Sequence, residues 1–170
     1  MTCIVALQHD GKVYLGADSS AVENGGISTR IEPKIFKKGR FLIGYCNSFR
    51  FGQIVEYYFN PPKSKSSTIM EYMVCQFVPE LISVTKYHDV EENTSSLIIG
   101  YEGKIFYIDS DWQVGWDTTD YHAIGSGADV AMGSLYSTPD KEPLERLRIA
   151  LEASEKFSTT VSRPFNYLTA

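Results

Sequence analysis

Hydrophobic and polar residues alternate along six short segments of the chain, and these segments group in pairs around turn dipeptides. Asp10-Gly11, Lys38-Gly39 and Glu102-Gly103 each separate two such segments, and a glycine at this place favours a tight hairpin turn. The paired segments cover residues 3–8 with 12–17, 34–37 with 40–45, and 95–101 with 104–108. Three hairpins predict mainly antiparallel sheet.

Between the second and third hairpins, apolar residues recur three and four positions apart, which predicts two helices. The first helix places Phe51, Ile54, Val55 and Tyr58 on one face and stops before Pro61-Pro62. The second places Met70, Met73, Val74, Phe77 and Leu81 on one face, and Pro79 is expected to kink or end it. We interpret both apolar stripes as faces buried in a core.

Two more helices and a closing strand complete the expected order. One helix starts near Asp129, and another opens at Pro143 with Leu144, Leu147 and Leu151 on its inner face. The last strand is expected over residues 165–168. Paired strands, paired helices, paired strands and paired helices favour two sheets packed face to face with helices on both outer sides. We see no linker or internal repeat, so residues 1–170 are interpreted as one domain.

Composition narrows the possible partners. The chain has 170 residues, a net charge of −5 and scattered basic residues, so nucleic acid is not expected as a partner. No apolar run approaches the roughly 20 residues that span a bilayer, and no secretion signal opens the chain, so we expect a cytoplasmic protein without membrane contact.

The cysteines and histidines show no metal-binding spacing. Cys3, Cys46 and Cys75 are far apart and form no C-x-x-C pair, which argues against a disulfide framework and a structural zinc site. His9, His88 and His122 are equally scattered. No metal and no cofactor are therefore expected.

The start of the chain offers a candidate nucleophile. Other signatures are missing: there is no G-x-S-x-G elbow and no P-loop, and Gly125-Ser126-Gly127 is too short for a dinucleotide fingerprint. A residue as small as Thr2 permits removal of Met1. Thr2 would then carry a hydroxyl nucleophile and a free α-amine that can act as its base.

From Thr2 to the last strand, the chain resembles proteasome β-subunits, especially the bacterial HslV peptidase and related proteasome-like proteins of bacteria or phages. The resemblance rests on Thr-x-Ile-Val from Thr2, on Leu15-Gly16-Ala17-Asp18, on the spacing to Lys34, and on Ala123-Ile124-Gly125-Ser126-Gly127 before a helix. It implies an α+β fold, the four-layer αββα sandwich of N-terminal-nucleophile (Ntn) hydrolases.

The resemblance also implies site residues. Thr2 would be the nucleophile, Lys34 would stabilise its alkoxide, Asp18 would hold Lys34, and Ser126 would relay protons at the amine. The backbone N–H of Asn47 would be the oxyanion donor, at a place where the family usually has glycine; asparagine tolerates unusual backbone angles better than most residues.

One segment departs from the family pattern. Proteasomes carry an aspartate and a serine near the C-terminus, whereas this chain offers Phe157 and Thr160. The Thr160 hydroxyl can replace that of a serine, but Phe157 cannot replace a carboxylate.

The function implied is a threonine peptidase that forms an acyl-enzyme in a self-compartmentalising ring. Two stacked homo-oligomeric rings, an ATP-dependent unfoldase and unfolded polypeptide substrates would be its partners. The alternative is a catalytically silent structural or assembly subunit, which the loss of the carboxylate at Phe157 favours. A third reading is an amidase with Cys3 as nucleophile, which requires loss of both Met1 and Thr2.

Overall fold

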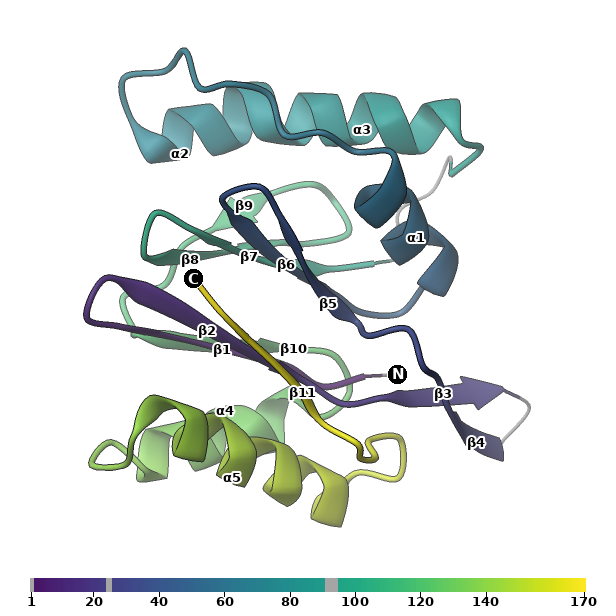
Figure 1. Ribbon diagram of the computed structural model, residues 1–170, viewed down its shortest axis with the longest axis vertical. Coiled ribbons are helices and arrows are strands. Elements are labelled where there is room, and N and C mark those ends of the chain that lie inside the picture. Colours follow the sequence, from purple (N-terminus) through teal and green to yellow (C-terminus); the bar gives the residue numbers. More distant parts are fainter. Residues whose placement is uncertain (1, 24–25, 91–94) are drawn as a thin grey trace.

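The computed structural model describes residues 2–23, 26–90 and 95–170. Two antiparallel sheets lie face to face between two helical layers (Figure 1). One sheet has the strand order β10-β1-β2-β11 and the other β5-β6-β7-β8-β9, while β3 and β4 pair separately. This arrangement confirms the predicted α+β, four-layer αββα sandwich.

The strands and the helices have the following bounds, each set given in chain order. The strands are β1 (Ile4–His9), β2 (Lys12–Ala17), β3 (Ser20–Glu23), β4 (Gly26–Thr29), β5 (Ile35–Lys38), β6 (Phe41–Tyr45), β7 (Leu97–Tyr101), β8 (Lys104–Ile108), β9 (Val114–Gly115), β10 (Tyr121–Ile124) and β11 (Asn166–Thr169). The helices are α1 (Phe49–Tyr57), α2 (Ile69–Tyr72), the π-helical turn η1 (Met73–Phe77), α3 (Val78–Tyr87), α4 (Ala128–Ser137) and α5 (Pro143–Phe157).

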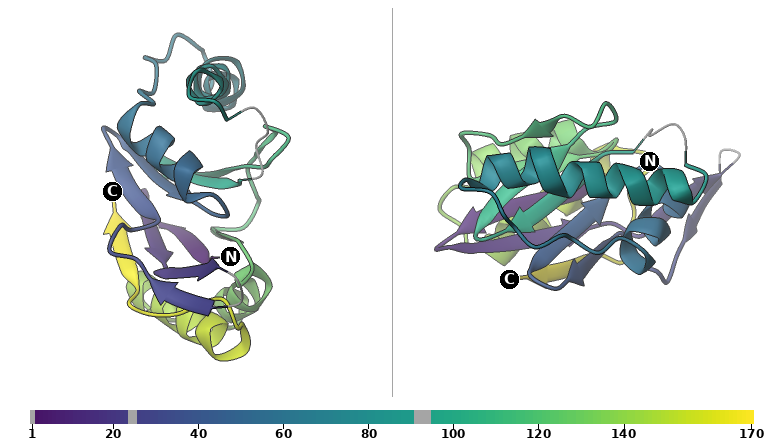
Figure 2. Two further views of the ribbon diagram at one scale, coloured as in Figure 1. Left: turned by 90° about the vertical axis from the view of Figure 1, so that its right-hand side faces the viewer. Right: turned by 90° about the horizontal axis from the view of Figure 1, so that it is seen from above.

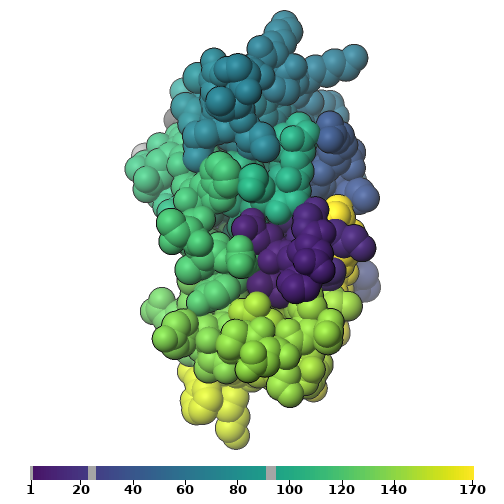
Figure 3. Space-filling model, turned by 90° about the vertical axis from the view of Figure 1, so that its left-hand side faces the viewer, coloured from purple at the N-terminus to yellow at the C-terminus, as the bar shows by residue number. Residues whose placement is uncertain are grey.

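The three predicted hairpins form at the turn dipeptides. In the β1–β2 turn, Asp10 and Gly11 both have positive φ, 48° and 72°, and in the β7–β8 turn Glu102 and Gly103 have 50° and 73°. Two consecutive residues with positive φ match the twist of the flanking strands. Figure 3 shows the end of the molecule where the β1–β2 turn, in purple, is exposed.

Alternation along the strands builds three separate cores. On β1, Ile4 and Ala6 face the second sheet, while Val5 and Leu7 face α4 and α5. On β6, Leu42 belongs to the core between the sheets. Its neighbours Phe41 and Ile43 belong to the core that α1 and α3 cover. The left view of Figure 2 shows the resulting succession of layers from a second side.

Three residues predicted on buried helix faces are exposed. Tyr58 follows the end of α1 and is 53% exposed, and the next residue, Phe59, fills the core instead. Val74 is 48% exposed because it lies in the π-helical turn η1, whose wider turn rotates it away from the stripe. Leu144 is 49% exposed, whereas Pro143 is buried at the start of α5.

The predicted effect of Pro79 was also wrong in part. The helical run continues without interruption from α2 through η1 to the end of α3, and Pro79 lies in the first turn of α3. Pro79 has no backbone N–H to donate, and the change to a π-helical turn directly before it lets the helical run continue without that hydrogen bond. The proline therefore marks a change of helix type and not an end.

Four strands were not predicted. The hairpin of β3 and β4 projects beside the sandwich (Figure 1). Every residue of β4 is exposed, so this strand has no alternation of apolar and polar residues by which it could be predicted. The other two are the two-residue β9 and the edge strand β10, which pairs with β1. Among the described residues, no helix is both long enough and apolar enough to cross a membrane.

Close approach of the two sheets predicts a sharp effect of a methyl group at Gly44. A Cβ there would lie 2.8 Å from Ile4 Cγ2 and 3.1 Å from Ile35 Cγ2, both on stiff β-branched side chains. Gly44→Ala is expected to lower the free energy of unfolding by about 1 to 3 kcal/mol through overpacking. Urea denaturation followed by circular dichroism measures it.

Gly133→Ala is the matched control, because nothing lies within 4 Å of a Cβ at this exposed position in α4. It is expected to raise the free energy of unfolding by roughly 0.5 to 1 kcal/mol through helix propensity. Equal effects of the two substitutions would contradict the close packing of the sheets at Gly44.

Candidate active site

A buried ion pair joins the two sheets near the start of the chain. Asp18 directly follows β2 in one sheet, and Lys34 directly precedes β5 in the other. Lys34 Nζ lies 2.8 Å from Asp18 Oδ1, and the side chains are 2% and 0% exposed. The sequence separation of 16 residues gives no hint of this contact, which the sandwich itself creates.

The Asp18 carboxylate accepts further hydrogen bonds from the backbone. The N–H of Cys3 donates to Oδ1 at 2.9 Å, and the N–H of Ser20 donates to Oδ2 at 3.0 Å. The hydroxyl of Ser20 also contacts Oδ2. These donors stabilise the ionised carboxylate and hold it in one orientation toward Lys34.

Burial lowers the pKa of Lys34 below its usual value, and the charge and hydrogen bond of Asp18 oppose this shift. The Lys34 ammonium also lies 6.0 Å from the centre of the Phe49 ring. A desolvated ammonium interacts strongly with any negative charge that develops nearby. The arrangement therefore suits the stabilisation of an alkoxide.

Residues 125–127 hold both backbone polar groups of Thr2. The nitrogen of Thr2 donates to Ser126 Oγ at 3.1 Å, and its carbonyl accepts from Ser126 Oγ at 3.3 Å and from the N–H of Gly127 at 3.2 Å. Gly125 has φ of +95°, and a Cβ there would lie 2.2 Å from the Thr2 carbonyl oxygen, so this position requires glycine. Thr2 itself is 3% exposed.

The nitrogen of Thr2 is an amide in the chain that begins at Met1. In a chain that begins at Thr2, the same atom is the α-amine. The contact with Ser126 then becomes a contact between a hydroxyl and a titratable amine.

A chain of hydroxyl groups leads away from this nitrogen. Ser126 Oγ lies 2.7 Å from Thr160 Oγ1, and Thr160 Oγ1 lies 3.2 Å from Ser158 Oγ. Hydroxyls both donate and accept, so such a chain can pass a proton along. Phe157, for which the sequence resemblance led us to look for a carboxylate, is the last residue of α5 and 77% exposed.

Asn47 adopts the backbone conformation that its position demands. It has φ of +73° and lies between β6 and α1, next to Ser48, which caps α1 by accepting from the N–H of Phe51 at 3.2 Å. Left-handed φ angles are usual for glycine and tolerated by asparagine. Asparagine is therefore compatible with this turn.

The two cysteines beside the site are buried thiols. Burial raises the pKa of Cys3 to about 12 and also raises the pKa of Cys46. Cys3 Sγ contacts Ser154 Oγ at 3.5 Å, on the side of the sheet that faces α5. Since the thiolate is the reactive form, the geometry disfavours Cys3 as a nucleophile.

The structure thus brings together Asp18 with Lys34, and Thr2 with Ser126, at the same end of the sheets. Sequence reasoning missed Ser20 and Ser158. Their partners Asp18 and Thr160 were both singled out by the resemblance, but no periodicity or spacing marks a serine that bonds to them.

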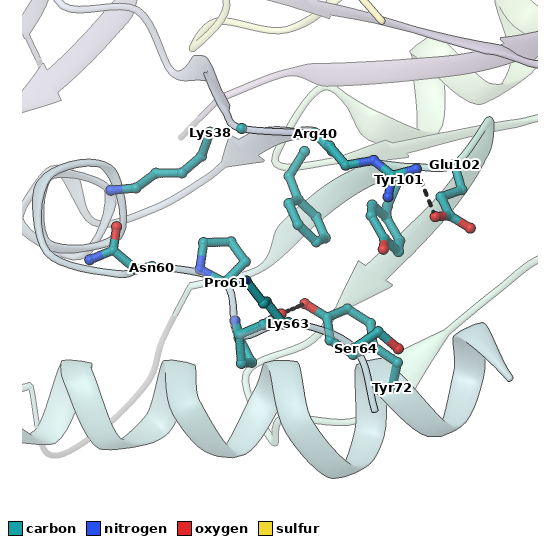
Figure 4. Close-up of a pocket in the computed structure, with 12 residues that line it drawn as sticks. Lys38, Arg40, Asn60, Pro61, Lys63, Ser64, Tyr72, Tyr101 and Glu102 are labelled. Atoms are coloured by element: carbon teal, nitrogen blue, oxygen red, sulfur yellow. Dashed lines mark hydrogen bonds and ion pairs between the residues drawn. The ribbon is translucent and has the colours of Figure 1, made fainter. Parts of the chain in front are cut away.

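A separate groove of about 620 Å³ lies at the far end of β5 from Lys34. It is lined by Lys38, Arg40 and Tyr101 among others, and the residues from 60 to 64 close one side (Figure 4). Arg40 pairs with Glu102 at 2.9 Å, and Tyr72 donates to the Pro62 carbonyl at 2.7 Å. The groove is therefore distinct from the cluster around Thr2.

Comparison with solved structures reveals close likeness of fold. BPH from Thiobacillus denitrificans, in complex with epoxomicin, has a TM-score of 0.84 at 22% identity over 99% of this chain and 97% of that one. Eukaryotic HslV from Trypanosoma brucei has a TM-score of 0.68 at 16% identity over 98% of both chains. Anbu, described as an ancestral beta-subunit, from Yersinia bercovieri has 0.73 at 13% identity over 98% of this chain and 80% of that one.

No protein-family model and no curated protein sequence matches the chain. The likeness is therefore one of fold: the chain has the αββα architecture of the proteasome- and HslV-type Ntn hydrolases. At these identities, the roles of individual residues have to be argued from their own chemistry.

The ion pair predicts non-additive effects of substitution on stability. Lys34→Met leaves the Asp18 carboxylate buried without its cation, which is expected to cost about 3 to 5 kcal/mol of unfolding free energy. Adding Asp18→Asn removes the uncompensated charge, so the double variant should be more stable than Lys34→Met by about 1 kcal/mol or more. Urea denaturation of the four proteins gives the coupling, and strict additivity would contradict a direct pair.

The lowered pKa of Lys34 predicts a pH dependence. Between this lowered value and the usual 10.5, the unfolded chain binds a proton at Lys34 that the folded chain does not. Unfolding free energy therefore rises with pH across this window, and below it the contribution of Lys34 is constant. Wild type should gain stability relative to Lys34→Met from neutral pH toward 10.5, and a difference that stays flat or falls would contradict the shift.

Proposed function

We propose that this chain, as a single domain with Met1 removed, is a threonine-type endopeptidase that cleaves peptide bonds through an acyl-enzyme on Thr2. The proposal rests on one observation: two independent groups of residues contact the start of the chain. One is the buried Lys34–Asp18 pair, and the other is the Ser126 hydroxyl at the Thr2 nitrogen. Together they supply a cation for an alkoxide and an oriented base.

In the first half of the reaction, the Thr2 hydroxyl oxygen attacks the substrate carbonyl carbon. The α-amine of Thr2, with an ordinary pKa of about 7.7 to 8.0, accepts the hydroxyl proton. The Lys34 ammonium stabilises the developing alkoxide, and Asp18 keeps that ammonium charged and oriented. The C–N bond then breaks, the amine proton passes to the leaving nitrogen, and an ester to Thr2 remains.

In the second half, water replaces the leaving group. The free α-amine takes a proton from water as its oxygen bonds to the ester carbon, and the C–O bond to Thr2 breaks as the proton returns to the Thr2 oxygen. The backbone N–H of Asn47 is proposed to stabilise the oxyanion in both halves. Ser126 orients the amine and exchanges protons with Thr160.

We also propose a homo-oligomeric ring that secludes the sites. A second stacked ring and an ATP-dependent unfoldase are inferred from the sequence resemblance. Tyr57 and Tyr58 are 69% and 53% exposed at the end of α1 and are proposed as contacts between subunits, while Phe59 belongs to the chain's own core. Free thiols at Cys3, Cys46 and Cys75 accord with a cytoplasmic location.

The fold likeness also suggests a ligand. Because BPH from Thiobacillus denitrificans was solved in complex with epoxomicin, we propose that epoxomicin binds the processed form of this chain at Thr2. Binding that survives Thr2→Ala unchanged would contradict this assignment.

The exposed position of Phe157 favours a second candidate, a catalytically silent subunit of the same fold. Its side chain is 77% exposed, and the chain of hydroxyls runs through Thr160 to Ser158. Among the described residues, no carboxylate bonds to either of these two hydroxyls. Under this reading, the chain keeps the fold and assembly but does not turn over peptides.

The test begins with intact mass spectrometry, to select protein that starts at residue 2. Thr2→Ala, which also permits removal of Met1, is expected to lower turnover of peptide amides by roughly three to six powers of ten because the nucleophile is lost. Thr169→Ala, an exposed threonine on β11, is the matched control and should retain wild-type turnover.

Wild-type turnover by Thr2→Ala would overturn the mechanism. Correctly processed wild type that cleaves no peptide in a broad library would favour the silent subunit. Circular dichroism and denaturation of each variant separate loss of the nucleophile from loss of the fold.

A further inference from the structure

Ser20 occupies a position that the proposed reaction does not yet use. It is the first residue of β3, two residues after Asp18, and it is fully buried. Its backbone N–H donates to Asp18 Oδ2 at 3.0 Å, and its hydroxyl contacts the same oxygen. Lys34 and the N–H of Cys3 both bond to the other oxygen, Oδ1. Ser20 and Lys34 therefore hold opposite oxygens of the carboxylate.

The same hydroxyl reaches a distant part of the chain. Ser20 Oγ lies 2.6 Å from the carbonyl oxygen of Thr160, which follows α5 and is 140 residues away in sequence. The hydroxyl of Thr160 contacts Ser126, and Ser126 accepts from the Thr2 nitrogen. A continuous path of contacts thus runs from Asp18 through Ser20, Thr160 and Ser126 to Thr2.

The Ser20 hydroxyl has two acceptors within reach but a single proton to donate. A serine hydroxyl has one proton, so it donates to Asp18 or to the Thr160 carbonyl, but not to both at once. An ionised carboxylate is the stronger acceptor, and so the hydroxyl donates to Asp18 while the carboxylate carries its charge.

We propose that Ser20 is a positioning residue that couples the Lys34–Asp18 pair to the Ser126–Thr160 hydroxyls at the Thr2 amine. It touches no reacting atom and acts through Asp18 and Thr160. The inference rests on the proposed function, because it assigns Ser20 a role in that same site. Without its hydroxyl, Asp18 loses its side-chain link to the Thr160 carbonyl, and only backbone N–H groups, those of Cys3 and Ser162, still connect the carboxylate to the amine-holding half of the site.

Ser19 provides a matched control next to Ser20. It is 2% exposed, and its hydroxyl accepts from Asn166 Nδ2 at 2.9 Å on the side of β11. Ser19→Ala therefore removes a hydroxyl from an adjacent buried position but leaves the hydrogen bonds of the Asp18 carboxylate in place. Any difference between the two alanine variants reports the specific contacts of Ser20.

The kinetic experiment measures kcat and KM of processed protein on a peptide amide. Ser20→Ala is expected to lower kcat by about 10- to 100-fold, as misplacement of catalytic groups does, with KM changed by less than about 3-fold. Ser20→Thr keeps a hydroxyl and should recover most of the lost kcat, while Ser19→Ala should keep kcat within about 2-fold of wild type. Wild-type kcat in Ser20→Ala, or an equal loss in Ser19→Ala, would overturn the proposal.

A second measurement does not require activity. The amide of Gly127 donates to the Thr2 carbonyl and reports the arrangement at the amine end of the path. In ¹H–¹⁵N spectra, its chemical shift should move in Ser20→Ala and stay in place in Ser19→Ala. Shift changes confined to the neighbours of Ser20 would overturn the coupling.

The two measurements separate the two ideas. Inactive wild type in which the Gly127 amide responds to Ser20→Ala contradicts the proposed peptidase and retains the coupled network. Active wild type in which neither kcat nor the Gly127 amide responds contradicts the role of Ser20 and retains the peptidase.

Discussion

A lysine ammonium and a carboxylate that are both withdrawn from water have to satisfy each other, since neither finds solvent to do so. In this fold the requirement links two sheets, because Asp18 directly follows a strand of one sheet and Lys34 directly precedes a strand of the other. The backbone N–H groups of Cys3, Ser20 and Ser162 and the Ser20 hydroxyl also contact the carboxylate. The pair therefore orients the start of the chain as well as the sheets, because Cys3 is the immediate neighbour of Thr2.

The predictable part of the fold is the part with local signals. The β1–β2 and β7–β8 hairpins are encoded by turn residues that accept positive φ, and the alternation of β1 assigns its two faces to two cores. Val74 and Leu144 were misplaced because periodicity assumes an ideal α-helix, whereas η1 is wider and α5 starts with a buried proline. The exposed β4 has no apolar face, so it offered no pattern to detect.

In the candidate site, too, some residues could be predicted from the sequence and others could not. Asp18, Lys34 and Ser126 were found because a family resemblance carries their spacing, and the structure gives each of them a partner at hydrogen-bonding distance. The contacts of Thr160 could not be foreseen, since they depend on how the segment after α5 returns to the sheet. Contacts between residues more than a hundred positions apart follow from tertiary packing, which a single sequence does not display.

The hairpin of β3 and β4 lies wholly between the two members of the ion pair along the chain. Its base is closed by a hydrogen bond from the N–H of Arg30 to the carbonyl of Ser19, at 3.1 Å, and β4 beyond it contributes nothing to a core. Exposed segments with anchored ends tolerate changes of composition. The exposed residues of β4 can therefore be exchanged for others, or for the sequence of a binding peptide, while the charged pair at the root of the hairpin stays in register.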